Sequence, residues 1–402
     1  MSSESEGAAP APSRPGPPSP SDFLGLDAQL TEDERALRDS TRAFVEARIL
    51  PGISEWYERG EFPVHLAKEI GGLGLLGMHL SGHGTAGRSA VDYGLACLEL
   101  EAGDSGLRSF VSVQGSLAMF PIWRFGSDEQ KAEWLPRMAS GEAIGCFGLT
   151  EPGAGSNPSA MTTSARRDGG DWVIDGHKRW STNATAAEIA VVWAQTDEGV
   201  RGFLVPRGTP GFEVRLIDGK LSLRASLSAE FTLDGVRLPD SAVLPGVRGL
   251  KGPLSCLNEA RYGIVWGAVG AARACFESAL EYARTREQFG KPIGGFQITQ
   301  AKLVEMLVEL SKAALLALHL GRAKDAGTLR PEQVSLGKLN NVREALEIAR
   351  SARTILAANG ITYDYPVMRH ANNLESVLTY EGTSEVHTLI LGKAITGLDA
   401  FQ

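Results

Sequence analysis

The chain has 402 residues, of which 43% are hydrophobic and 22% are charged, and its formal net charge is −8. This length predicts two or three domains with a large buried core. The negative charge, without any basic cluster, argues against a nucleic-acid-binding protein. No apolar run is long enough to cross a lipid bilayer, which argues against a membrane-spanning protein.

The cysteines and histidines form no familiar metal or disulfide pattern. The four cysteines lie far apart and none belongs to a Cys-x-x-Cys pair: they are Cys97, Cys146, Cys256 and Cys275. We therefore expect buried free thiols in a reducing compartment. The seven histidines lack spacings such as His-Glu-x-x-His, so we expect no metal.

Residues 1–21 are rich in Pro, Ser, Ala and Gly, and we expect them to form a disordered leader. The leader carries Glu4 and Glu6 and has neither an arginine-rich amphipathic face nor an apolar core. It is therefore unlike a transit or signal peptide, and we expect a cytoplasmic protein.

Residues 22–145 are expected to form a helical domain. A capping box at Thr31–Glu34 predicts the start of the first helix, and Pro51 should end it. Further helical patterns occur at 64–70, 91–101 and 130–138.

A glycine-rich run at 72–77 matches the dinucleotide-binding pattern G-x-G-x-x-G. That motif binds a dinucleotide only when a strand precedes it and a helix follows it. Here the preceding residues, 65–70, have a helical pattern. We therefore interpret the run as a helix end with a glycine cap.

Residues 146–248 are expected to form the middle β domain, because short strand-like runs alternate with turns. Two Asp-Gly pairs, Asp175-Gly176 and Asp234-Gly235, each lie between apolar runs and predict two hairpin turns. Closely spaced strands of this kind predict a small antiparallel barrel or sandwich.

Residues 249–402 are expected to form a C-terminal helical bundle. Three long helical patterns run over about 258–285, 297–326 and 331–358, and a fourth follows from Leu389. Long helices with periodic apolar residues, joined by short breaks, are typical of an antiparallel bundle.

Glu381 is the first candidate functional residue. It precedes Gly382 in a hinge between two apolar segments, where a carboxylate has little reason to serve the core. Gly382 lacks a Cβ and so allows another molecule to approach the backbone. Thr383, with Glu385 and Val386, predicts the cap and first turn of the last helix. A solvated loop charge beside a helix cap is the alternative interpretation.

Three further segments have the character of binding sites. The run 147–157 leads from a strand into a glycine-rich loop, which offers free backbone N–H groups to an anionic or polar ligand. A tight interdomain turn is the alternative there. Around 284–292 two arginines end a long helix beside Phe289. Arginine can bind a pyrophosphate group bidentately. The alternative is that these arginines only complement the helix dipole. Arg108 lies among small and apolar residues and needs an anion, which could be a structural partner such as Glu101 or Asp104.

Together these segments resemble the acyl-CoA dehydrogenase family, and specifically its glutaryl-CoA dehydrogenase branch. The resemblance extends from about Asp22 to Phe401. The residues that carry it are Asp104–Gly106 with Arg108 and Ser109, Cys146–Pro152, Ser222–Ser226, Leu257 and Asn258 with Ala260–Gly263, and Tyr380–Thr383. It implies a mainly α fold with a central β domain: an N-terminal helical domain, a small antiparallel β-barrel and a C-terminal four-helix bundle.

The resemblance implies FAD as the cofactor. In this chain the implied contacts are Phe147, Leu149, Thr150, Ser156, Trp180, Thr182, Thr383 and Glu385, with Arg286, Phe289 and Gln297 reaching from a neighbouring subunit. The family's Gly-Gly pair near the flavin pyrophosphate is replaced by Ala357-Ala358, and two added methyl groups could shift that contact.

The resemblance also implies that Glu381 is the catalytic base. In the glutaryl branch Arg108 would hold the distal carboxylate of the substrate, with Ser109 and Glu101 beside it. Further substrate contacts are implied for Ser156, Leu254, Asn258, Arg261, Tyr380 and Gly382.

The function predicted from this resemblance is oxidative decarboxylation of glutaryl-CoA to crotonyl-CoA and CO₂. A homotetramer that passes electrons to an electron-transfer flavoprotein is implied with it. Two alternatives remain. The first is dehydrogenation, without decarboxylation, of another short or carboxylated acyl thioester that is bound to CoA or to a carrier protein. The second is a non-catalytic binding protein of the same fold.

Overall fold

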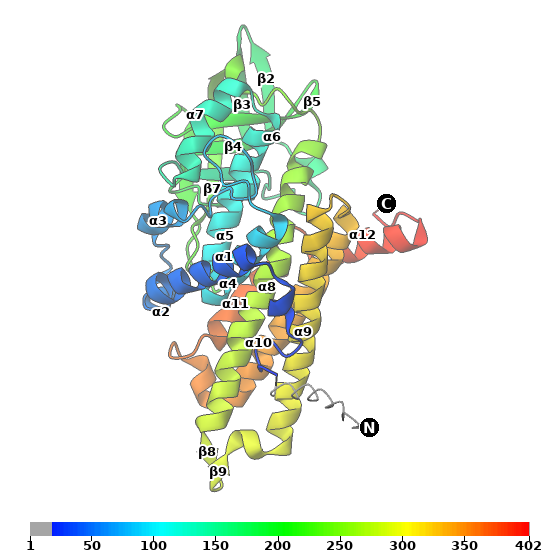
Figure 1. Cartoon of the computed structure of the whole chain (residues 1–402). Helices are drawn as coiled ribbons and strands as arrows, with labels where there is room; N and C mark the ends of the chain where they lie inside the picture. The colour runs from blue at the N-terminus through cyan, green and yellow to red at the C-terminus, as the bar shows by residue number, and fades with distance from the viewer. Residues whose placement is uncertain (1–17, 402) are drawn as a thin grey trace, which may run out of the picture.

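The computed structural model describes residues 18–401 as three consecutive regions (Figure 1). Most of the expected leader, residues 1–17, lies outside the described residues. The helices of the first region are α1 Glu32–Phe44, α2 Ile53–Arg59, α3 Ala67–Gly72, α4 Ala90–Gly103, α5 Ser105–Ser112, α6 Phe120–Phe125 and α7 Asp128–Ala139. The predicted helical character of this region is thus confirmed.

The predicted helix start at Thr31 is confirmed in detail. The Thr31 hydroxyl accepts a hydrogen bond from the Glu34 N–H at 3.2 Å, and the Glu34 carboxylate accepts one from the Thr31 N–H at 2.8 Å. This reciprocal capping satisfies donors that a helix start otherwise leaves unpaired.

The glycine-rich run at 72–77 is a helix end, as expected. Helix α3 stops at Gly72, and both Gly74 and Gly77 have positive φ angles, of 72° and 64°. The residues before the run are helical, so the strand that a dinucleotide-binding motif requires does not precede it.

The middle region is one seven-stranded sheet with the order β1-β4-β2-β3-β7-β6, and β5 pairs with β4. Its strands are β1 Gly145–Gly148, β2 Ser164–Asp168, β3 Asp171–Thr182, β4 Ile189–Thr196, β5 Gly199–Pro206, β6 Phe212–Leu216 and β7 Ser228–Pro239. Most neighbours are antiparallel, as predicted, but β4 runs parallel to both β1 and β2.

The prediction of a hairpin turn at each of the two Asp-Gly pairs is wrong. Both pairs lie inside long continuous strands, β3 and β7, at a break in the register between those strands. There the Gly235 N–H donates to the Asp175 carboxylate at 2.7 Å. The pairs therefore face each other across a β-bulge, which uses the same residue types as a hairpin turn.

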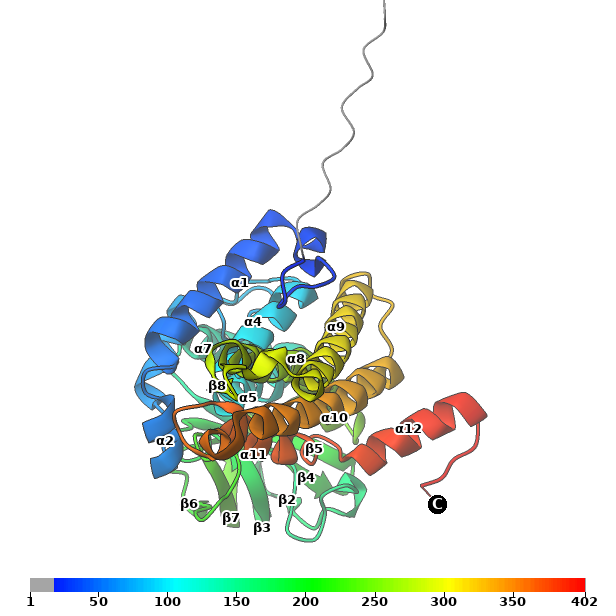
Figure 2. The same cartoon turned by 90° about the horizontal axis from the view of Figure 1, so that it is seen from below.

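The last region contains the three predicted long helices and two shorter ones. They are α8 Lys251–Thr285, α9 Gln297–Asp325, α10 Pro331–Leu356, α11 Val367–Val377 and α12 Ser384–Thr396. Helix α8 begins at Lys251, ahead of the expected start at Asn258. In Figures 1 and 2, α8, α9 and α10 run side by side, while α12 projects away from the body. The small hairpin of β8 Glu287–Gln288 and β9 Lys291–Pro292 lies at the end of the bundle opposite the sheet (Figure 1).

Helix α8 contacts all three regions, because it packs against α4 and α10, and its Gly252 lies against the ring of Trp193 in β4. All four cysteines are buried and free, as expected. No helix within residues 18–401 is both long and apolar enough to cross a membrane.

Candidate active site

A cavity of about 1500 Å³ lies where the sheet meets the helical bundle. Pockets for a single drug-sized ligand usually measure about 300–1000 Å³, so this cavity has room for more than one ligand. The expected site residues that line it are Ser109, Phe147, Leu149, Thr150, Ser156, Trp180, Thr182, Leu254, Asn258, Arg261, Tyr380, Glu381, Gly382 and Thr383.

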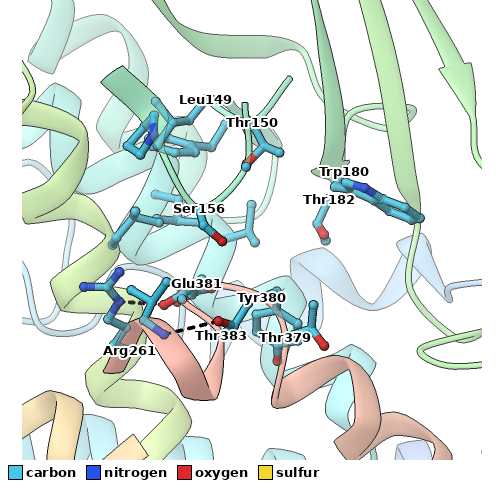
Figure 3. A pocket seen from close by; sticks show the side chains of 18 of the residues that line it. Leu149, Thr150, Ser156, Trp180, Thr182, Arg261, Thr379, Tyr380, Glu381 and Thr383 are labelled. Atoms are coloured by element: carbon cyan, nitrogen blue, oxygen red, sulfur yellow. Dashed lines mark hydrogen bonds between the residues drawn. The ribbon is translucent and has the colours of Figure 1, made fainter. Parts of the chain in front are cut away.

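Glu381 reaches the cavity from a short turn between α11 and α12 (Figure 3). Its φ angle is 54°, in the left-handed region that non-glycine residues rarely adopt. Gly382 follows with φ 101°, and a Cβ there would lie 2.8 Å from the ring of His387. Thr383 caps α12, as predicted, because its hydroxyl accepts a hydrogen bond from the Val386 N–H at 3.3 Å.

The Glu381 carboxylate has an environment suited to a base. Its Oε2 atom is buried and has no hydrogen-bond partner within residues 18–401. Burial raises the pKa of this carboxyl above its ordinary value, while the charges of Arg108, Lys338 and Arg261 lower it in part. Such a raised pKa brings a carboxylate closer to the range in which it can accept a proton from a weak carbon acid.

Two cations hold the backbone on which Glu381 is mounted. The Lys338 ammonium, from α10, donates to the carbonyls of Tyr380 and Gly382, each at 2.6 Å. Arg261, from α8, donates to the carbonyl of Glu381 at 2.6 Å, and Figure 3 draws this bond. Arg261 was among the predicted site residues, but Lys338 was missed, because it stands in an amphipathic helical pattern without any motif.

Arg108 and Glu101 lie beneath the cavity wall rather than on its surface. Both side chains are fully buried and form an ion pair of 2.6 Å. Arg108 also donates to the Tyr380 hydroxyl, which lies 3.5 Å from that of Ser109. Gly267 on α8 leaves room for the pair, since a Cβ there would come within 2.0 Å of the Glu101 carboxylate.

Each member of this buried ion pair has one polar atom that forms no hydrogen bond within residues 18–401. Nη1 of Arg108 and Oε1 of Glu101 have no hydrogen-bond partner among the described residues. The pKa of Arg108 is raised by Glu101 and Tyr380 against the effect of burial, so the guanidinium stays charged. Burial raises the pKa of Tyr380 to about 12, so its hydroxyl remains protonated.

The opposite side of the cavity fits a planar ring with polar edges. Phe147 and Leu149 supply apolar surface, and the hydroxyls of Thr150, Ser156 and Thr182 lie at its rim. In Figure 3 Leu149, Thr150 and Ser156 face Glu381 across the cavity. Trp180 is 54% exposed, with a φ of 63°, which is an unusual position for a large aromatic side chain without a ligand.

A buried ion pair fixes the loop that carries these residues. The Lys178 ammonium donates to the Leu149 carbonyl at 3.0 Å and to the Glu151 carboxylate at 2.9 Å. Glu151 in turn accepts from the N–H groups of Thr162 and Thr163, at 2.7 and 2.9 Å. The glycine-rich segment is therefore held at its first turn, which keeps Leu149 and Thr150 at the cavity edge.

Some expected cofactor residues do not line this cavity. Arg286 and Phe289 lie in or beside the β8–β9 hairpin, at the far end of the bundle, and Phe289 is 94% exposed. Gln297 starts α9 near them. Ala357 and Ala358 begin a 3₁₀ turn after α10, and Glu385 is exposed on the first turn of α12.

Comparison with known proteins identifies the family. Models of the N-terminal, middle and C-terminal domains of acyl-CoA dehydrogenases match residues 31–142, 146–236 and 247–396. The chain belongs to the acyl-CoA dehydrogenase family.

Two crystal structures and one curated relative define the similarity further. A glutaryl-CoA dehydrogenase from Mycobacterium smegmatis is 66% identical, with a TM-score of 0.95, and the match covers 96% of this chain and 100% of that chain. A second such structure, in complex with FADH₂, is 61% identical over the same shares, also with a TM-score of 0.95. The human mitochondrial short-chain specific acyl-CoA dehydrogenase is 36% identical over 90% of each chain.

The predicted family, fold class and cofactor are thus confirmed: the protein is an FAD-dependent acyl-CoA dehydrogenase, and glutaryl-CoA dehydrogenases are among the proteins that it resembles. The hydroxyl-rimmed apolar wall described above fits the flavin. The individual roles expected of the site residues remain predictions, which the following sections develop.

The substituted alanine pair gives a prediction about backbone strain. Ala357 has φ 53° and ψ −130°, a conformation open almost only to glycine. Relief of such strain is worth about 1–3 kcal/mol, so Ala357→Gly should raise the melting temperature of the purified holoenzyme. Ala358→Gly is the matched control and should lower it slightly, since φ is not positive there. Equal effects of the two substitutions would contradict this account.

Proposed function

We propose that this dehydrogenase oxidises and decarboxylates glutaryl-CoA to crotonyl-CoA and CO₂. The observation that carries the proposal is the buried Arg108 guanidinium, whose Nη1 has no partner among the described residues. A carboxylate at the end of the acyl chain is the chemical group that best complements it, because guanidinium and carboxylate match in charge and geometry.

The balance of charge beside the cavity supports an anionic acyl chain. Three cationic side chains, Arg108, Arg261 and Lys338, surround two carboxylates, Glu101 and Glu381. With all five ionised, one positive charge is left over. An uncompensated charge in a buried site is costly, so binding of one further carboxylate would be favourable.

In the proposed reaction Glu381 removes a proton from the α-carbon of the bound thioester. General-base catalysis is typically worth about 10²–10⁴-fold. The thioester oxygen gains negative charge as the proton leaves, and the N–H of Glu381 is the proposed donor to it. Because Lys338 and Arg261 bind the carbonyls of this turn, they would fix the position of the N–H relative to the carboxylate.

Bound FAD supplies the oxidising chemistry by accepting the β-hydrogen as hydride. The protein's part is to hold the α- and β-carbons between Glu381 and the wall formed by Leu149 and Thr150. The resulting enoyl thioester bears a carboxylate on its γ-carbon. When the bond to that carboxylate breaks, CO₂ leaves and the electron pair moves into the conjugated thioester. Glu381 then returns its proton to the γ-carbon, which gives crotonyl-CoA.

A second candidate function is the oxidation of a short unsubstituted acyl thioester without decarboxylation. The 2.6 Å ion pair favours it, because Glu101 could neutralise Arg108 without any help from the substrate. In that case Arg108 would serve only the structure, and the substrate preference would not depend on it.

Electron transfer and assembly are proposed by resemblance to the family. An electron-transfer flavoprotein would reoxidise the flavin. A homotetramer would bring Arg286, Phe289 and Gln297 to the flavin of a neighbouring subunit, and the 94% exposure of Phe289 supports such a contact. Apolar side chains are also exposed on the outer face of α9, among them Ile298 and Val304.

Glu381→Gln should abolish catalysis while FAD remains bound, because the amide keeps the shape of the side chain and cannot accept the proton. The measurement is anaerobic bleaching of flavin absorbance on addition of glutaryl-CoA. Glu347→Gln, on the exposed face of α10, is the matched control and should bleach normally. Turnover that survives Glu381→Gln would rule out this residue as the base.

Arg108→Gln should impair the oxidation of glutaryl-CoA much more than that of butyryl-CoA. Loss of one partner of a buried charge pair costs about 2–5 kcal/mol. Only glutaryl-CoA has a distal carboxylate that could pair with Arg108, whereas butyryl-CoA has none. The measurement is the ratio of kcat/KM for the two substrates.

The double variant Arg108→Gln with Glu101→Gln is the control for stability, since it leaves no unpaired charge within the original pair. It should fold like the wild type and still have lost the preference for glutaryl-CoA. If both substrates lose activity equally, or if the double variant regains the preference, the second candidate function holds.

A further inference from the structure

Lys338 is a buried lysine that none of the sequence motifs includes. It lies in the first half of α10, is 2% exposed, and directs its ammonium at the turn between α11 and α12. Its two hydrogen bonds, each 2.6 Å long, go to the peptide carbonyls on either side of Glu381. The ammonium also lies 5.8 Å from the centre of the Tyr380 ring.

This arrangement constrains the turn. Because one atom holds the carbonyls of both Tyr380 and Gly382, the turn cannot open without breaking two charge-assisted hydrogen bonds. Glu381 sits between them in a left-handed conformation, with φ 54°. A strained conformation of this kind persists only when the surrounding structure over-determines it. The Arg261 bond to the Glu381 carbonyl is the third restraint on the same turn.

We propose that Lys338 is a positioning residue, which fixes the backbone turn that aims the Glu381 carboxylate into the cavity. This inference rests on the proposed role of Glu381 as the base. It assigns a second function to helix α10, which otherwise serves as a bundle helix.

The charges around Lys338 determine how its loss would act on Glu381. The charged and titratable groups that face it are Glu381 and Tyr380 on the turn, Arg261 on α8, Arg108 on α5 and His387 on α12. Burial lowers the pKa of Lys338, and the Glu381 carboxylate opposes that shift. In return the ammonium lowers the pKa of Glu381. Removal of the ammonium should therefore raise the pKa of the base, so that activity is lost at a higher pH as the solution is acidified.

Asn341, one turn further along α10, provides a matched control. It is 1% exposed, and its amide also donates to two backbone carbonyls, those of Val265 and Ala313, at 3.0 and 3.1 Å. Those carbonyls belong to α8 and α9, not to the turn that carries Glu381. Asn341→Ala thus removes a buried donor with similar bonding but leaves the turn untouched.

The test compares Lys338→Met, Lys338→Gln and Asn341→Ala in the full-length holoenzyme. Lys338→Met keeps an unbranched side chain that is one atom shorter, and it removes both the charge and the donor. It should lower kcat about 100-fold, the scale expected when a catalytic group is misplaced by about an ångström. It should also move the acid limb of the pH profile of kcat/KM upward. Lys338→Gln keeps one donor, so the same pH shift should accompany a smaller loss of kcat.

Hydrogen exchange of a peptide that covers 379–383 gives a readout independent of turnover. Exchange there should accelerate in Lys338→Met and stay at the wild-type rate in Asn341→Ala, whose acid limb should also be unchanged. Wild-type kcat, pH profile and exchange in both Lys338 variants would overturn the inference. Failure of both variants to fold, while Asn341→Ala folds, would also overturn it in favour of a structural role.

The outcome separates this inference from the proposed function. If Glu381→Gln is inactive and the Lys338 variants behave like the wild type, Glu381 is the base and Lys338 does not position it. If Glu381→Gln remains active, the assignment of the base itself fails, whatever the Lys338 variants do.

Discussion

The candidate site is built around Glu381, whose carboxylate atom Oε2 is buried without a hydrogen-bond partner among the described residues. Such a group is stable only where the surrounding backbone and charges compensate for lost hydration. Lys338 and Arg261 provide that compensation indirectly, because they bind the carbonyls of the turn and leave the carboxylate oxygens free. The side chain can thus be fixed in direction and still be available to a substrate.

The three regions of the fold each contribute one part of this arrangement. The helical first region places Arg108 and Glu101 beneath the cavity wall, and the sheet region contributes Leu149 and Thr150 to the lining. The bundle supplies the turn with Glu381. Helix α8 serves two of these parts, since its Gly267 leaves room for the buried ion pair and its Arg261 holds the carbonyl of Glu381.

Much of the architecture could be predicted from the sequence because long helices carry strong periodic signals. The capping box at Thr31 and the cap at Thr383 were correctly identified from local residue types. The two Asp-Gly pairs were misassigned because a hairpin turn and a β-bulge favour the same residues, and only the pairing of β3 with β7 distinguishes them. That pairing is a long-range property, which no short window of sequence contains.

The residues that surround the cavity could be predicted where motifs marked them and not elsewhere. Glu381, Arg108 and the segment around Thr150 are recognised through their neighbours in the chain. Lys338 has no such neighbours in the chain. Its proposed role comes from its hydrogen bonds to a turn that lies more than forty residues later in the sequence. The positions of Arg286 and Phe289 at the far end of the bundle could likewise be understood only once the three-dimensional path of α8 and α9 was known.

The identity of the product tests the central claim most directly. The enzyme would be incubated with glutaryl-CoA and an artificial electron acceptor, and the thioesters formed would be identified by mass spectrometry. A base at Glu381 opposite an arginine-bound distal carboxylate predicts crotonyl-CoA with one CO₂ released per turnover. Accumulation of glutaconyl-CoA, or oxidation of butyryl-CoA with no reaction of glutaryl-CoA, would contradict it.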